Sequence, residues 1–157
     1  MTRSTIFEAA GGEPAFLALT AAHHQRCLAD EVLEHPFSHA GHPQHVERLA
    51  GYWMEVFGGP PRYSQAPTEP AGSQSMVQRI HAGNQAQDDM PDRFLACFLA
   101  AMDDVALPSD PELRTAMGDY MRWAVADVHR FNPQGSVVPA DLAIPRWSWA
   151  GLIVGEG

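Results

Sequence analysis

The histidines are the side chains in this sequence best suited to ligand or metal chemistry. His45 begins an apolar stripe that continues through Leu49 and Trp53 at steps of four residues, so His45 is expected to face inward on a helix. An inward imidazole needs a hydrogen bond, a metal ion or the iron of a cofactor as its partner. His81, in a later helical segment, is the candidate across from it, although by position alone such a histidine is more often a surface residue or a helix cap.

A zinc site is a second interpretation of the same region. His39, His42 and His45 follow one another at steps of three residues. Gly41 and Pro43 interrupt any helix that could place the three imidazoles on one face, and no cysteine or carboxylate nearby completes a tetrahedral set. The sequence therefore disfavours zinc.

Helical periodicity dominates the elements that must position these residues. The pattern predicts a helical turn at 6–10 and helices at about 13–33, 44–57, 75–81, 89–105 and 110–130. The clearest start is Ser109-Asp110-Pro111-Glu112, a capping box with proline just inside it. A Pro-, Ser- and Gly-rich loop follows Gly59, and no alternating strand pattern occurs. The sequence predicts an all-α protein.

Composition excludes several classes of function. The chain has 157 residues and a formal net charge of −9, which argues against nucleic acid and against anionic membrane surfaces. All ten cationic residues are arginine, so Schiff-base chemistry lacks its lysine. The first residues lack an apolar signal core, so we expect a cytoplasmic protein. Cys27 and Cys97 are expected to be buried small side chains rather than a disulfide framework.

Several segments in order resemble a truncated haemoglobin, the 2-on-2 globin, and most closely its group II. They are FEAAGG, ADEVLEHPF, ERL leading to FGGPPRYS, a histidine after the loop, and MPDRFLACFLAAMDDVALPSDPELRTAM. The resemblance runs from Phe7 to about Asn132. It implies an all-α 2-on-2 helical sandwich over residues 1–132, and residues 133–157 extend past the usual end of the family.

The resemblance also assigns roles to individual residues. His81 matches the proximal haem ligand, while His24 and His45 match the distal positions, where they are the candidate catalytic residues. The remaining matches or neighbours of the cofactor are Phe37, Arg48, Leu49, Tyr63, Arg79, Phe94 and Phe98. The chain departs from the group pattern in having His24 in place of tyrosine and Phe94 in place of tryptophan, so its distal polar network must differ. Around His81 it reads QRIHAGNQ, with Gly83 where the family has proline.

The function that the resemblance implies is binding of haem b (iron protoporphyrin IX) and of a diatomic gas such as O2, NO or CO. Oxygen or nitric-oxide redox chemistry, resembling that of an NO dioxygenase or a peroxidase, would need a reductase that the sequence does not identify. Two alternatives stay open. One is a six-coordinate haem, ligated by His24 or His45, for electron transfer or redox sensing; the other is a globin fold without haem that acts as a binding module.

The extension is too apolar to lie in water, with Val137, Val138, Leu142, Trp147 and Trp149 among its residues. Pro133, Pro139 and Pro145 divide it into short pieces. We expect it to fold back on its own domain or to be exchanged in a homodimer.

Overall fold

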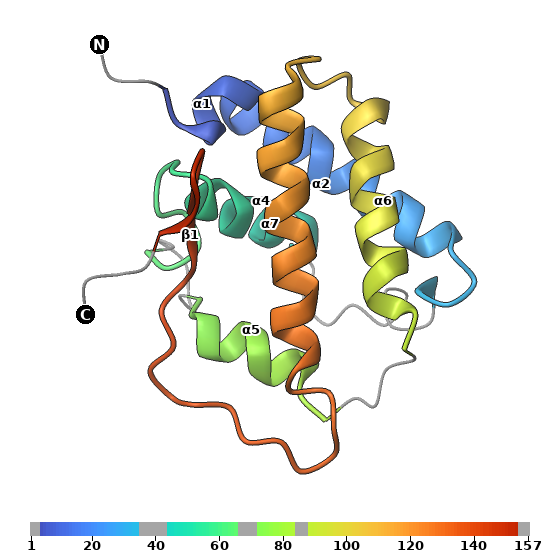
Figure 1. Ribbon diagram of the computed structural model, residues 1–157. Helices are drawn as coiled ribbons and strands as arrows, with labels where there is room; N and C mark the ends of the chain where they lie inside the picture. The colour runs from blue at the N-terminus through green and yellow to red at the C-terminus, as the bar shows by residue number, and fades with distance from the viewer. Residues whose placement is uncertain (1–3, 35–43, 66–71, 84–87, 154–157) are drawn as a thin grey trace.

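Six helices and one short hairpin make up the part of the chain that the structure describes. The computed structural model describes residues 4–34, 44–65, 72–83 and 88–153, and of Ile80 only the backbone (Figure 1). The predicted haem contact Phe37 and the histidines His39 and His42 lie outside these residues. The elements are α1 (Ile6–Ala10), α2 (Gly12–Ala29), α4 (His45–Val56), α5 (Gln74–His81), α6 (Met90–Asp104), α7 (Pro111–His129), β1 (Arg146–Ser148) and β2 (Gly151–Ile153).

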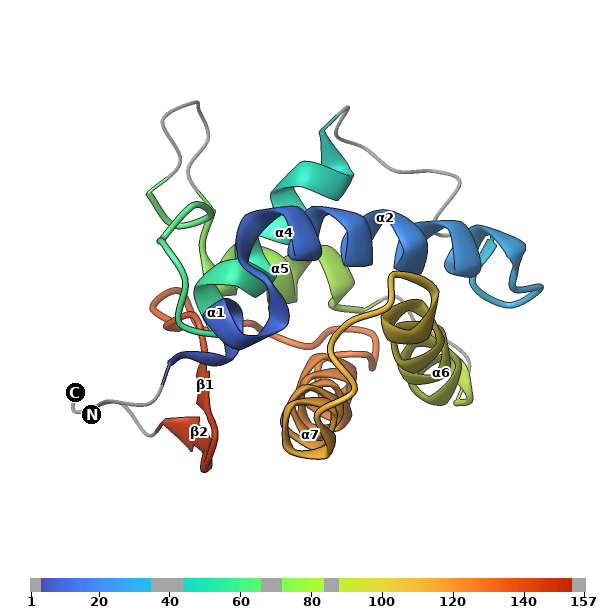
Figure 2. The ribbon, with the colours of Figure 1, turned by 90° about the horizontal axis from the view of Figure 1, so that it is seen from above.

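The long helices form two layers. In the view of Figure 2, α2 and α4 form the upper layer of the picture, and the antiparallel pair α6 and α7 forms the lower layer. The space between the layers is filled by large buried side chains, among them Phe16, Phe57, Phe98 and Tyr120. This arrangement confirms the predicted helical sandwich. None of the helices in the described ranges is long and apolar enough to span a bilayer.

Capping side chains explain where α5 and α7 begin. The Asp110 carboxylate accepts a hydrogen bond from the backbone N–H of Glu112 at 3.0 Å, and Pro111 occupies the first turn of α7. Ser73 caps α5 in the same way, through the N–H of Met76 at 3.1 Å. At α6 the predicted cap residue Asp89 is in place, but its side chain makes no capping bond and pairs with Arg93 instead.

Helix α2 ends earlier than its apolar pattern predicts. The prediction extended it to Leu33, whereas the helix ends at Ala29. The Asp30 carboxylate accepts hydrogen bonds from the N–H groups of Val32 and Leu33, at 2.8 and 3.1 Å. A side-chain acceptor of this kind satisfies backbone donors in a turn and so competes with continuation of the helix.

The turn after α4 depends on two glycines. Gly58 has a φ of +92°, a conformation that L side chains rarely adopt. A Cβ on Gly59 would lie 2.8 Å from the ring of Phe7 and from the carbonyl oxygen of Met54. The Gly58-Gly59 pair therefore allows α1 to pack directly against the end of α4.

The C-terminal extension contains a hairpin that the sequence analysis did not predict. β1 and β2 pair antiparallel, with Trp147 opposite Leu152. Each strand has only three residues, which is too short for an alternating pattern to be recognised. Trp147 packs on Tyr120 and Trp123 of α7, with ring centroids 5.6 and 5.8 Å away.

Candidate functional site

The predicted proximal residue, His81, is the last residue of α5 and is exposed. Its Nδ1 lies 2.8 Å from the carbonyl oxygen of Val77, one turn earlier. A carbonyl oxygen only accepts, so Nδ1 carries the proton and donates it. In the neutral imidazole the other ring nitrogen, Nε2, then carries the lone pair, which is the tautomer in which a histidine ligates a metal through Nε2.

The two predicted distal histidines face each other across the α2–α4 contact. His24 on α2 and His45 on α4 are both half-buried, and their ring centroids are 5.6 Å apart at an interplanar angle of 56°. The structure therefore brings together two residues that are 21 positions apart in sequence. Each imidazole can donate or accept a hydrogen bond, depending on its tautomer.

A third imidazole, His23, lies in the core beside this pair; we call His23, His24 and His45 the histidine cluster. His23 is completely buried, and its ring packs edge-on against Phe94, with centroids 4.4 Å apart. Its Nε2 lies 3.4 Å from the carbonyl oxygen of Phe94 and 3.5 Å from Sγ of Cys27. The cluster thus extends from the half-buried pair into the interior.

Burial keeps His23 neutral. Loss of hydration lowers the pKa of His23 from 6.5 to about 4. The Phe94 carbonyl opposes this shift, and the neighbouring imidazoles of His24 and His45 add to it. The sequence analysis assigns His23 no role. The sequence nevertheless indicates that His23 is buried, because it belongs to a set of α2 residues that recur at helical spacing. The set is Phe16, Leu19, Thr20, His23 and Cys27.

Apolar side chains predicted to wall the cofactor lie next to the histidine cluster. Phe98 is fully buried and packs edge-on against Trp53, with centroids 5.2 Å apart. Phe94 and Leu49 are half-buried and pack against the same core. An apolar wall with a few polar groups is the common composition of a cofactor site.

The polar side chains predicted to match or neighbour the cofactor are spread over two regions. The guanidinium of Arg48 lies over the ring of Tyr63, with Cζ 5.4 Å from the centroid. Tyr63 is buried: burial raises the pKa of its hydroxyl, and a hydrogen bond from Arg48 opposes that shift. Arg79 is exposed on α5. Their contacts with the cofactor stay predictions.

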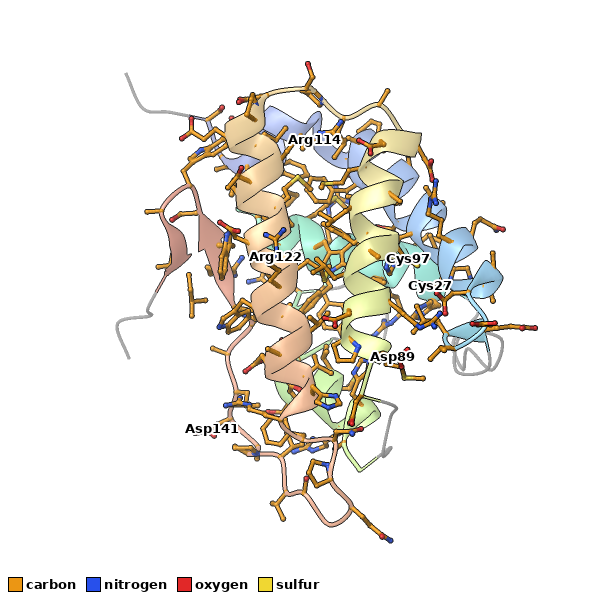
Figure 3. All side chains as sticks on the ribbon, turned by 45° about the vertical axis from the view of Figure 1, so that its right-hand side comes forward. Cys27, Asp89, Cys97, Arg114, Arg122 and Asp141 are labelled. Carbon is orange, nitrogen blue, oxygen red and sulfur yellow. The ribbon has the colours of Figure 1, made fainter. Side chains whose placement is uncertain are left out.

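The two cysteines lie together in a small cluster that also contacts Phe94. Cys27 of α2 and Cys97 of α6 are buried in one small cluster with Leu33, and the two side chains lie close together (Figure 3). Burial raises the pKa of both thiols. They carry no disulfide, as expected.

No group of three or more metal-ligating side chains is found within residues 4–34, 44–65, 72–83 and 88–153. A groove of about 580 Å³ runs between α6 and α7, and it contains none of the predicted haem contacts. It is lined by Pro91, Asp92, Leu95, Arg122, Val125, Ala126, His129 and Arg130.

The residues present are compatible with a haem. The Nδ1 of His81 donates to the Val77 carbonyl oxygen, which in the neutral ring leaves the lone pair on Nε2. The histidine cluster offers two further, half-buried imidazoles, His24 and His45, and its third member, His23, packs on Phe94. A single axial imidazole, polar groups on the ligand side and apolar walls are the elements by which a protein controls a haem iron.

Comparison with known proteins agrees with this architecture. The chain is similar to haemoglobin from the thermophilic phototrophic bacterium Chloroflexus aurantiacus, with 29% identity over 80% of this chain and 98% of that one, at a TM-score of 0.66. A thermostable haemoglobin from Thermobifida fusca gives 29% identity, coverage of 80% and 96%, and a TM-score of 0.63. The group II truncated haemoglobin from Bacillus anthracis shares the fold at 18% identity, coverage of 86% and 96%, and a TM-score of 0.67. The chain matches no curated protein sequence.

A family model described as bacterial-like globin matches residues 5–127, which include α1, α2 and α4 to α6 and nearly all of α7. The solved structures to which the chain is similar are truncated haemoglobins, as the sequence resemblance indicated. This chain therefore belongs to the bacterial-like globin family.

Proposed function

We propose that this protein binds haem b through Nε2 of His81 and takes up a diatomic ligand such as O2 or NO beside His24 and His45. Membership of the globin family implies haem binding. The observation that carries the assignment of His81 is the 2.8 Å hydrogen bond from its Nδ1 to the carbonyl oxygen of Val77. This bond orients the ring and selects the neutral tautomer whose lone pair is on Nε2.

The haem iron would supply the binding of the gas and any redox chemistry. The chain supplies the surroundings. His24 and His45 can each present an N–H to negative charge that develops on the ligand. His23, buried and neutral at physiological pH, supports the wall formed by Phe94 and Phe98. Oxygen or nitric-oxide redox turnover with an external reductase is the activity that we propose for this arrangement.

A second candidate is a six-coordinate haem for electron transfer or redox sensing. It is favoured by the contact between His24 and His45, since either imidazole could serve as a sixth ligand if its helix moved toward the iron. In that case one distal histidine occupies the position that a gas would otherwise take.

An absorption spectrum of the purified, haem-reconstituted protein tests both candidates. A five-coordinate, high-spin ferrous spectrum is the expected result. A low-spin ferrous spectrum without added ligand would establish the second candidate, and the absence of a Soret band would leave a binding module without haem.

The ligand is tested with His81→Gly. This variant should bind haem weakly, and millimolar imidazole should restore the five-coordinate spectrum by taking the place of the missing ring. His129→Ala is the matched control, because His129 lies in the last turn of α7 and belongs to none of the predicted haem contacts. An unchanged spectrum in His81→Gly without imidazole would remove His81 from the proposal.

A further inference from the structure

The short helix that ends in His81 is held at its N-terminal end by the C-terminal extension. Ser75 is in the first turn of α5 and is 1% exposed. Its hydroxyl donates to the carbonyl oxygen of Pro139 at 2.7 Å and accepts from the backbone N–H of Leu142 at 3.0 Å. Both partners belong to the extension, more than 60 residues away in sequence.

The rest of α5 is held by other parts of the fold. Gln78 Nε2 donates to Asp127 of α7 at 2.8 Å, and the N–H of Gly83 donates to the carbonyl oxygen of Phe131 at 2.8 Å. At the N-terminal end, beside Ser75, Tyr52 of α4 also donates to Gln74 Oε1 at 2.6 Å. Helix α5 has a small interface with the other helices, much smaller than that between α2 and α4, so these few polar contacts weigh heavily in its position.

The extension is itself anchored at both ends. Figure 1 shows it leaving the lower end of α7, passing beside α5 and rising to β1. At its far end, Arg146 pairs with the buried carboxylate of Glu55 at 3.2 Å, and Trp147 packs on Tyr120. The segment that contacts Ser75, from Pro139 to Leu142, therefore lies between the end of α7 and the hairpin, which are both fixed to the rest of the fold.

We infer that the extension acts as a strap that positions α5 through Ser75, and thereby sets the orientation in which His81 meets the haem iron. This inference rests on the proposed role of His81 as the ligand. Ser75 is a positioning residue: it lies six residues before His81, about 9 Å along the helix axis at 1.5 Å per residue. Since the C-terminal end of α5 is held by Gln78 and Gly83, a movement of about 1 Å at Ser75 would tilt the helix by about 6°.

Ser75→Ala tests the strap, because it leaves the Pro139 carbonyl and the Leu142 N–H without their partner. The matched control is Ser136→Ala, which removes a hydroxyl of the same extension that bonds only to Pro133 of the extension itself, at 2.6 Å. Hydrogen exchange of the α5 amides in the purified full-length protein should accelerate about tenfold in Ser75→Ala and stay unchanged in Ser136→Ala. If the exchange rate of the α5 amides is unchanged in Ser75→Ala, the extension does not position α5 and the inference is wrong.

The spectroscopic readout separates positioning from simple stabilisation. In the ferrous, five-coordinate protein, the iron–histidine stretching band should shift or broaden in Ser75→Ala and not in Ser136→Ala. Faster exchange with an unchanged band would show that the strap stabilises α5 without setting the orientation of His81, and would overturn the inference. If the wild-type protein binds no haem, the proposed function fails, while the exchange experiment still decides whether the strap exists.

A reciprocal variant leaves α5 untouched. Leu142→Pro removes the N–H that donates to Ser75, whereas Leu142→Ala keeps it. Leu142→Pro should accelerate α5 exchange more than Leu142→Ala, and it should add little in a chain that already carries Ser75→Ala. Fully additive effects would show that Ser75 and the extension act independently, contrary to the inference.

Discussion

The carboxylate of Glu55, in the last turn of α4, is 1% exposed and lies 3.2 Å from Nη2 of Arg146 on β1, 91 residues later in the chain. The backbone N–H of Ser64 donates to its other oxygen at 2.9 Å, and the Ser64 hydroxyl also donates to the carboxylate. Arg146 Nη1 donates in addition to the carbonyl oxygen of Glu55 at 2.7 Å. One buried acid therefore joins α4, the loop that follows it and the C-terminal hairpin.

Arg146→Ala should lower the free energy of unfolding by about 1–3 kcal/mol, because it leaves a buried carboxylate with only its Ser64 partners. The loss stays below that for a fully buried pair, since the Arg146 side chain is 44% exposed. Urea denaturation measures it. Arg122→Ala is the control: its pair with Asp119 is more than half exposed on both sides and should contribute less than about 0.5 kcal/mol. Equal losses in the two variants would contradict the importance of Glu55.

Either His24→Leu or His45→Leu should speed O2 dissociation about ten- to hundredfold. Each substitution removes an N–H donor from the pocket side of α2 or α4, and a hydrogen bond to a charged group contributes roughly 1.5–3 kcal/mol. Stopped-flow displacement of O2 by CO gives the rate, and His129→Leu serves as the control. If both variants stay within a factor of two of the wild type, the two histidines have no part in ligand stabilisation.

Stability should fall as the pH is lowered, because His23 is neutral in the core. Its pKa is about 4 in the folded chain against 6.5 in the unfolded one, so the unfolded state binds more protons between these values. The free energy of unfolding should drop by up to about 3 kcal/mol from pH 6.5 to pH 4. His23→Leu should flatten this pH dependence. The same slope in both proteins would assign it to other groups.

The thiols of Cys27 and Cys97 should resist modification in the native protein. Both are buried against each other, and burial raises the pKa of each thiol, so little thiolate is present for reaction. Labelling with a disulfide reagent at pH 8 should be slow in buffer and rapid in guanidinium chloride. Rapid labelling of the native chain would show that the contact between α2 and α6 opens easily.

Deletion of Val137 to Gly157 should lower the melting temperature by several degrees. It removes Trp147, which is 9% exposed and packs on Tyr120 and Trp123, and both extension partners of Ser75. Light scattering on the deleted and full-length chains would show whether the extension also builds a homodimer. An unchanged melting temperature, spectrum and mass would make the extension dispensable.

The sequence by itself determined the helices and the family. Asp110-Pro111 and Ser73 act on the backbone within three residues, and apolar spacing defines the inner face of each long helix, so these features are local and readable. The resemblance selected His81, His24 and His45, and α2 and α4 bring the latter two together. Their roles toward haem, and that of Phe37, stay predictions.

Only the tertiary structure decided which polar groups are buried, because burial depends on partners far along the chain. His23 and His24 are neighbours of the same type, yet packing of Phe94 and Trp53 encloses the first and leaves the second half-buried beside His45. Glu55 lies in an amphipathic helix where a solvent-facing carboxylate would be expected, and Arg146 makes its burial tolerable. Nothing in the local sequence distinguishes Ser75 from other residues in a first helical turn. It is buried and hydrogen-bonded only because the extension packs against it. Desolvating a polar group is unfavourable unless a partner meets it, and those partners become neighbours only when the chain has folded.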